Sequence, residues 1–127
     1  FVGSGSKKPL FDGEERVALA REAFAEVPNI RVEAYRELTV GYARRLGASA
    51  LVKGVRTVAD FESELQQAHM NSVLVPAIES VFLMTNPRYV FFSSSLIKEV
   101  AMAGGDVSGM VPAGVERALR QRRENRG

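Results

Sequence analysis

The sequence predicts an α/β fold with a parallel sheet, because strand-like and helix-like segments alternate along most of the chain. Short apolar or alternating segments are each followed by a stretch whose apolar residues recur every three or four positions. The chain has 127 residues, of which 46% are hydrophobic and 25% are charged. This length and composition suit one globular domain covering residues 1–127.

Four segments have the character of strands. Phe1-Val2 resembles the end of a strand that leads into the glycine–serine loop at residues 3–6. Residues 30–34 alternate apolar and polar side chains, which is typical of a strand with one buried face. The apolar runs at residues 48–52 and 80–84 predict strands that are covered on both faces.

Helices are expected between and after these strands, with recognisable residues at their ends. Asp12 and Glu15 have capping-box spacing, and Gly47 is placed to end a helix. The expected helices run from Asp12 to Val27, from Leu38 to Leu46, from Asp60 to Val73, from Leu96 to Ala103, and from Pro112 into the arginine-rich C-terminus.

Charge and composition exclude several classes of protein. The isoelectric point of 9.2 comes from a C-terminal segment, residues 116–127, whose net charge is +3, whereas the preceding residues carry −1. We therefore expect no nucleic-acid partner, and RNA binding by the tail stays an alternative. The absence of cysteine and the lone His69 argue against a disulfide scaffold, a zinc site and a histidine-centred triad. No apolar run is long enough to span a membrane, so no membrane partner is expected.

The residues that follow the expected strands indicate a binding site, because ligands of parallel sheets bind beyond the carboxyl ends of the strands. These loops supply cations to this edge. We interpret this as a site for a polyanionic small molecule, either a nucleotide or a phosphorylated metabolite. The loops contain Ser6-Lys7-Lys8, Arg36-Glu37-Leu38-Thr39, Lys53-Gly54-Val55-Arg56, and Asn86 and Arg88 with Ser93-Ser94-Ser95.

The serine run and the absence of a nucleophile–base pair limit the classes of reaction that this site could catalyse. Three hydroxyls at a helix start can stand beside free N–H groups that bind phosphate, although simple capping is the preferred interpretation of the serines taken alone. Glu62 and Glu64 are two residues apart and point in different directions on a helix, which argues against a paired-carboxylate hydrolase. Catalysis would then rest on positioning and charge stabilisation, as in phosphoryl or nucleotidyl transfer.

These residues resemble the bacterial phosphopantetheine adenylyltransferase family along essentially the whole chain. The resemblance implies a Rossmann-like, doubly wound sheet and transfer of AMP from ATP to 4′-phosphopantetheine, which gives dephospho-coenzyme A and pyrophosphate. The matching segments are Ser6-Lys7-Lys8-Pro9-Leu10-Phe11, Glu14-Glu15-Arg16, Lys53-Gly54-Val55-Arg56 with Asp60-Phe61-Glu62, residues 66–71, Ser93-Ser94-Ser95 with residues 96–101, and Gly104-Gly105-Asp106-Val107.

The resemblance also implies roles for individual residues. Lys7 and Lys53 would bind the phosphate of phosphopantetheine, and Leu38 and Thr39 would line its pantetheine arm, mostly through their backbone. The residues implied to hold ATP are Gly54, Val55, Arg56, Glu64, Tyr89, Val90, Phe91, Phe92, Ser93, Ser94 and Ser95. Mg²⁺ would accompany ATP, coenzyme A would act as an inhibitor, and the enzyme would be a cytoplasmic homohexamer.

The sequence departs from the family mainly at its beginning. The family's Thr/Ser-x-Gly-His motif, with the strand and helix around it, does not occur in these 127 residues. We expect that motif and its catalytic histidine upstream of Phe1, in a longer enzyme, since His69 does not replace it. Smaller departures are Ser63, Ser72-Val73 and Val90, where the family often has other residues.

Two other functions stay open at this point. One is a related nucleotidyltransferase that uses nicotinamide mononucleotide or glycerol phosphate as acceptor. The other is a non-catalytic module that binds a nucleotide or coenzyme A, which the missing histidine permits.

We predict that the 127-residue chain by itself has little adenylyltransferase activity and folds poorly. A central strand would be missing, which leaves the edges of neighbouring strands bare. Pyrophosphate release and thermal unfolding measured on this chain test both expectations. Turnover at the level of the intact enzyme, together with a cooperative melt, would contradict them.

Overall fold

The computed structural model describes residues 9–125, so the expected strand at Phe1-Val2 and the predicted ligand Lys7 lie outside the described residues. The described chain forms two compact units, one of residues 35–91 and one of residues 9–34 and 92–125. We call them the sheet unit and the helix unit. Their elements are α1 (Gly13–Ala23), α2 (Thr39–Arg45), β1 (Ala50–Val55), α3 (Val58–Leu74), β2 (Glu79–Met84), the short 3₁₀ helix η1 (Pro87–Tyr89), α4 (Ser94–Met102) and α5 (Ala113–Glu124).

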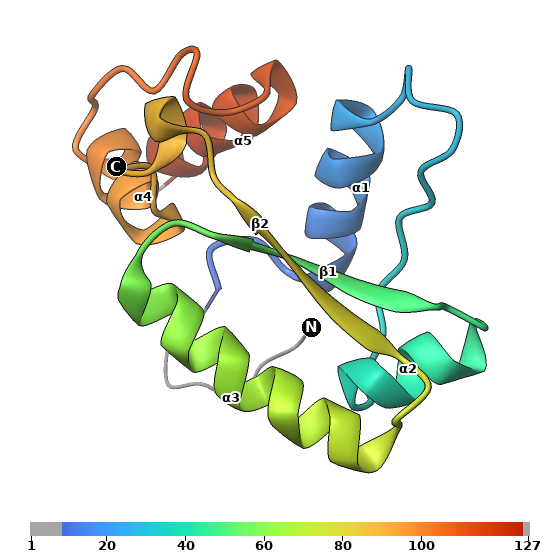
Figure 1. Ribbon diagram of the computed structural model, residues 1–127. Helices are drawn as coiled ribbons and strands as arrows, with labels where there is room; N and C mark the ends of the chain where they lie inside the picture. Colours follow the sequence, from blue (N-terminus) through green and yellow to red (C-terminus); the bar gives the residue numbers. More distant parts are fainter. Residues whose placement is uncertain (1–8, 126–127) are drawn as a thin grey trace. The chain divides into compact units, whose positions relative to one another are not determined.

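The sheet unit is built on a parallel strand–helix–strand crossover. β1 pairs with β2 in parallel, from Ala50 opposite Glu79 to Val55 opposite Met84, and α3 connects them (Figure 1). Thr57 caps the start of α3 by accepting a hydrogen bond from the Asp60 N–H at 3.2 Å. The predicted mixed α/β fold with a parallel sheet is confirmed.

The core of the sheet unit lies under one face of the two strands. Val40 and Ala43 of α2 pack with Val75 and Ile78, and Leu51 of β1 packs against this cluster. On the same face of the sheet, Phe82 meets Phe61 of α3 edge-on, with ring centroids 5.4 Å apart.

The opposite face of the sheet has no cover within the sheet unit. Val52, Val81 and Leu83 are 62%, 41% and 57% exposed there. The expectation that both strands are covered on two faces is therefore wrong for this unit. Its physical reason is that α2 and α3 both pack against the face that contains Leu51 and Phe82.

The helix unit packs α4 and α5 around a second apolar cluster, and α1 lies against α5. The buried residues of this cluster are Ile97, Ala101, Val107 and Leu119, and the last of these is 2% exposed. Ion pairs also connect α5 to α1, from Arg122 to Glu15 and from Arg117 to Glu22. Part of the charge of the arginine-rich C-terminal helix is thus paired within its own unit.

The predicted capping box of α1 is present, but the helix is shorter than expected. The Glu15 N–H donates to Asp12 Oδ1 and the Asp12 N–H donates to Glu15 Oε2, both at 2.8 Å. The helix ends at Ala23 instead of Val27, and residues 24–27 form successive turns. Pro28 disfavours helical backbone in the residue before it, which explains part of the early ending.

The strand expected at residues 30–34 does not form. This segment is irregular, and its Val32 carbonyl accepts a hydrogen bond from Arg21 at 3.2 Å. An alternating pattern becomes a strand only where another strand supplies hydrogen bonds, and β1 and β2 pair only with each other in the described chain.

The backbone conformation of the segment after α4 requires its two glycines and is stabilised by its aspartate. Gly104 has φ +87°, and a Cβ atom at Gly105 would lie 2.6 Å from Val100 Cγ1. Asp106 Oδ1 accepts a hydrogen bond from the Ser108 N–H at 2.8 Å, and this bond lowers the pKa of the Asp106 carboxyl. The sequence Gly104-Gly105-Asp106 therefore builds the turn that leads toward α5.

We predict that Leu119→Ala lowers the free energy of unfolding by about 2–5 kcal/mol, because it opens a cavity in the core of the helix unit. Urea unfolding of the complete protein, followed by circular dichroism, measures the change. Leu96→Ala is the matched control, since Leu96 on α4 is 47% exposed, and its cost should stay below about 1 kcal/mol. Equal losses in the two variants would contradict the assigned core.

Candidate functional site

The parallel register brings the residues after β1 and β2 to one edge of the sheet. Val55 and Met84 are opposite each other at the ends of the strands, and the Thr85 N–H donates to the Val55 carbonyl at 2.9 Å. Arg56 follows one strand and Asn86 closely follows the other. The predicted common edge therefore exists for these two loops of the sheet unit.

The structure corrects the place of the Lys53-Gly54-Val55-Arg56 motif. The sequence predicts all four residues in a loop after the strand, but β1 continues through Val55 and only Arg56 follows it. The longer strand is fixed by six paired positions with β2. Because Val55 is 1% exposed, its side chain packs in the core, and any contact with ATP would have to involve its backbone.

Lys53 and Glu64, which the resemblance assigns to different substrates, form an ion pair. The Lys53 ammonium lies 3.1 Å from Glu64 Oε2, and the two side chains are 29% and 27% exposed. That oxygen is buried, and no described donor meets it in hydrogen-bond geometry. Lys53 therefore compensates a partly desolvated carboxylate while it stays accessible to solvent.

Arg56 is paired in a similar way with an acidic residue of α3. Its Nε lies 3.1 Å from Asp60 Oδ2, and each side chain is 34% exposed. Their spacing of four residues spans the beginning of α3. Sequence reasoning missed Asp60 as the partner of Arg56, although this spacing is a recognisable signal.

Leu38 and Thr39 lie at the start of α2. Leu38 occupies the N-cap position without a capping side chain and is 67% exposed. Thr39 is the first helical residue, and its Oγ1 is 3.0 Å from the Tyr35 hydroxyl. An exposed apolar side chain next to a fixed hydroxyl can contact a ligand that has both apolar and polar groups.

The segment implied to hold ATP crosses the boundary between the two units. η1 begins after Asn86, whose Oδ1 accepts from the Arg88 N–H at 3.0 Å, and it includes Tyr89. The following Val90 is half-buried and Phe91 is 79% exposed, whereas Phe92 packs in the helix unit.

The serine run begins α4 as predicted. Ser93 Oγ accepts a hydrogen bond from the Leu96 N–H at 3.1 Å, so Ser93 is the N-cap, and Ser94 and Ser95 are exposed in the first turn. The capping interpretation of Ser93 is therefore confirmed. Lys53 and Arg56 belong to the other unit, so convergence of these cations with the serines stays a prediction.

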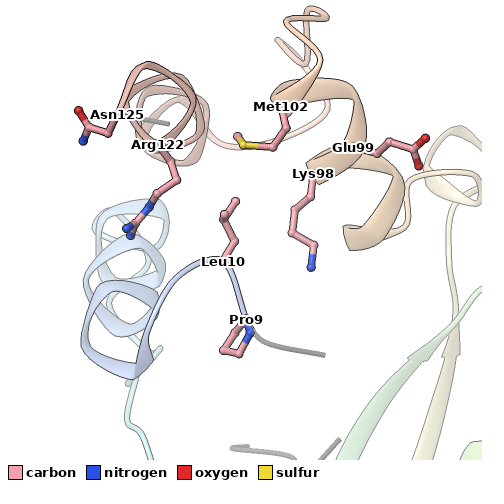
Figure 2. A pocket seen from close by; sticks show the side chains of 7 residues that line it. All are labelled: Pro9, Leu10, Lys98, Glu99, Met102, Arg122 and Asn125. Atoms are coloured by element: carbon pink, nitrogen blue, oxygen red, sulfur yellow. The ribbon is translucent and has the colours of Figure 1, made fainter. Parts of the chain in front are cut away.

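A hollow of about 570 Å³ lies within the helix unit, outside the predicted site. Figure 2 shows Leu10 between α4 and α5, with Lys98 on one side, Arg122 on the other and Glu99 turned away. Arg122 pairs with Glu15 and lies 5.5 Å from the centre of the Phe11 ring. Among residues 9–125, none of those implied to bind ATP or phosphopantetheine lines this hollow.

The described residues contain no group of three His, Asp or Glu side chains placed to hold a metal ion. Mg²⁺ commonly binds through substrate phosphates and one or two carboxylates, so this part of the chain offers no cage of its own for the ion. His69 is exposed on α3, as expected for a helical histidine. Among residues 9–125, none of the helices has the length and apolar character needed to cross a bilayer.

A family model and individual relatives of this chain point to the same family. The cytidylyltransferase-like family model matches residues 2–100. Phosphopantetheine adenylyltransferase from Desulforudis audaxviator (strain MP104C) is 52% identical over 98% of this chain and 76% of the relative. The enzymes of the same name from Roseiflexus sp. (strain RS-1) and Herpetosiphon aurantiacus are 49% and 48% identical over 91% of this chain, and 72% and 70% of their own lengths.

We predict that Lys53→Met costs about 1 kcal/mol more stability than Arg56→Met. The first change leaves the buried Glu64 oxygen without its cation, whereas Asp60 stays more accessible to water. Urea unfolding of both variants of the complete protein gives the comparison. The double variant Lys53→Met/Glu64→Gln should recover most of the loss, and a double variant as unstable as Lys53→Met would contradict the role of the pair.

Proposed function

Because the chain belongs to the phosphopantetheine adenylyltransferase family of cytidylyltransferase-like proteins, we propose that its protein transfers AMP from ATP to 4′-phosphopantetheine in coenzyme A biosynthesis. The products are dephospho-coenzyme A and pyrophosphate. The observation that carries this proposal is 52% identity to a phosphopantetheine adenylyltransferase along 124 residues of this chain.

The reaction joins two anions, and the cations of the sheet edge suit that requirement. A phosphate oxygen of phosphopantetheine forms a bond to the α-phosphorus of ATP, and the bond from that phosphorus to the bridging oxygen of the β-phosphate breaks. The electron pair leaves with pyrophosphate. Repulsion between the two substrates opposes the approach, and positive side chains around the phosphates reduce it.

We assign Lys53 to the acceptor phosphate. Its ammonium is partly exposed and is held by Glu64, so it is oriented before a ligand arrives. A phosphate dianion attracts the ammonium more strongly than a single carboxylate does, and the ammonium has three donors to divide between them. Lys7 would contribute a second cation to the same phosphate.

ATP binding is assigned to Gly54, Val55, Arg56, Glu64 and the segment from Tyr89 to Ser95. Arg56 follows β1, and its pairing with Asp60 leaves a third of its side chain accessible. Ser94 and Ser95 present exposed hydroxyls in the first turn of α4, where the free N–H groups of a helix favour phosphate. Leu38 and Thr39 would contact the pantetheine arm.

Other properties of the enzyme are proposed from the family alone. Mg²⁺ would accompany ATP and neutralise part of its triphosphate charge. The enzyme would be a cytoplasmic homohexamer, and coenzyme A would inhibit it. No residue of this chain is proposed as the catalytic histidine, because the Thr/Ser-x-Gly-His motif does not occur in its sequence.

The proposal is tested on the complete protein by pyrophosphate release with ATP and three acceptors. Turnover is expected with 4′-phosphopantetheine and at most weakly with nicotinamide mononucleotide or glycerol phosphate. Pantetheine without its phosphate should not react. Preference for another acceptor would overturn the proposed substrate, and tight ATP binding without turnover on any acceptor would favour a binding module.

We predict that Lys53→Met raises the KM for phosphopantetheine about 10- to 100-fold, because it removes a charge-assisted bond to phosphate. The KM for ATP should change much less. Arg44→Met is the matched control, since it removes an exposed cation from the last turn of α2 in the same unit. A similar rise in both variants would show that net charge, and not the place of Lys53, determines binding.

A further inference from the structure

The start of α2 departs from the usual chemistry of a helix N-terminus. Ser, Thr, Asp or Asn normally occupies the N-cap, whereas here the position is Leu38, which makes no side-chain capping bond. The side chain of Leu38 is also 67% exposed, so neither capping nor burial explains it. When a residue is unfavourable at its position and no packing or hydrogen bond compensates for it, a functional role at that position is indicated.

Four neighbouring side chains hold this helix start in place. The rings of Tyr35 and Tyr42 are stacked, with centroids 4.4 Å apart and planes 9° from parallel. The Arg45 guanidinium lies 4.9 Å from the centre of the Tyr42 ring and pairs with Glu37. We call Tyr35, Glu37, Tyr42 and Arg45 the tyrosine stack. It connects the segment before α2 to the second half of the helix.

The stack reaches Thr39 through one hydroxyl. The Tyr35 Oη is 3.0 Å from Thr39 Oγ1, in a partly buried position. The neighbouring Leu38 carbonyl accepts from the Tyr42 N–H at 2.9 Å. Thr39 is therefore bonded to a side chain of the stack, whereas Leu38 is linked to Tyr42 only by the first backbone hydrogen bond of the helix.

We propose that Tyr35 is a positioning residue for phosphopantetheine, fixing Leu38 and Thr39 through its hydroxyl and its stacked ring. The proposal rests on the proposed function, since it takes the acceptor arm as the ligand of these two residues. A site that is held in its binding geometry before the ligand arrives loses less entropy on binding. The tyrosine stack supplies that rigidity where the N-cap side chain does not.

Tyr35→Phe separates this role from general stability, because it keeps the ring stack and removes only the hydroxyl. In the complete protein, the KM for phosphopantetheine should rise about three- to tenfold, the range expected for one lost neutral hydrogen bond. The KM for ATP, the kcat and the melting temperature should stay close to wild type. Titration calorimetry with each substrate measures directly whether the affinity for phosphopantetheine falls while the affinity for ATP is unchanged.

A second variant tests whether the hydroxyl acts through Thr39. Thr39→Val removes the partner oxygen at nearly constant volume. If the two hydroxyls act as a pair, Tyr35→Phe/Thr39→Val should bind phosphopantetheine no more weakly than Thr39→Val alone. Additive losses would overturn the proposed pathway.

Ser72→Ala is the matched control, because it removes another hydroxyl hydrogen bond of the same unit, that from Ser72 to the His69 carbonyl at 2.8 Å. It should change neither KM. An unchanged phosphopantetheine KM in Tyr35→Phe, or equal rises for both substrates, would overturn the positioning role. If wild-type protein does not bind phosphopantetheine, the proposed function itself fails, and that result is distinct from wild-type binding that Tyr35→Phe leaves intact.

Discussion

The parallel pairing of β1 with β2 is the constraint on which the sheet-unit part of the candidate site depends. A parallel pair requires a crossover that returns along the whole length of the first strand. The 17 residues of α3 span about 25 Å and the six residues of each strand about 20 Å. The helix is thus long enough to bring the chain back, so that both strands end at one edge. Arg56 and Asn86 owe their common position to this match of lengths.

The same helix also pairs with the cation within β1 and with the cation that follows it. Glu64 and Asp60 are both on α3, and they pair with Lys53 and Arg56 at 3.1 Å. Each cation is therefore held in place and partly neutralised by a carboxylate, and in the proposed function it would meet a phosphate in that state. A ligand must offer more negative charge than one carboxylate to compete with these partners, which favours phosphate dianions and triphosphates over weaker anions. Most of the sequence is nearly neutral, and this is compatible with a phosphate site because the carboxylates that balance these cations lie directly beside them.

Features determined by neighbouring residues could be predicted from the sequence. The capping box of Asp12 and Glu15, the helix stop at Gly47 with φ +68°, and the capping serine Ser93 all depend on contacts within a few residues. They depend little on the rest of the fold, so spacing alone identifies them.

Features that depend on distant partners could not be predicted in this way. Residues 30–34 have the alternation of a strand, but β1 and β2 bond only to each other among the residues described, so the segment stays irregular. Apolar runs indicate that strands are buried, without saying which face is covered in a given unit. Lys53 and Glu64 meet across a strand and a helix, and no fixed sequence spacing corresponds to that contact.

The starts of α4 and α2 are stabilised in different ways, and the two ways leave different groups exposed. At α4, Ser93 caps the helix with its own side chain, which leaves Ser94 and Ser95 exposed for a ligand. At α2, Leu38 cannot cap, and the rigidity comes from rings and charges that lie before and after it. Polar ligands suit the first arrangement, since a serine serves both capping and binding. An apolar arm requires an apolar contact, and the helix must then be fixed by residues outside the N-cap. The difference between these two helix starts thus agrees with the different chemistry of the ligands that we propose for them.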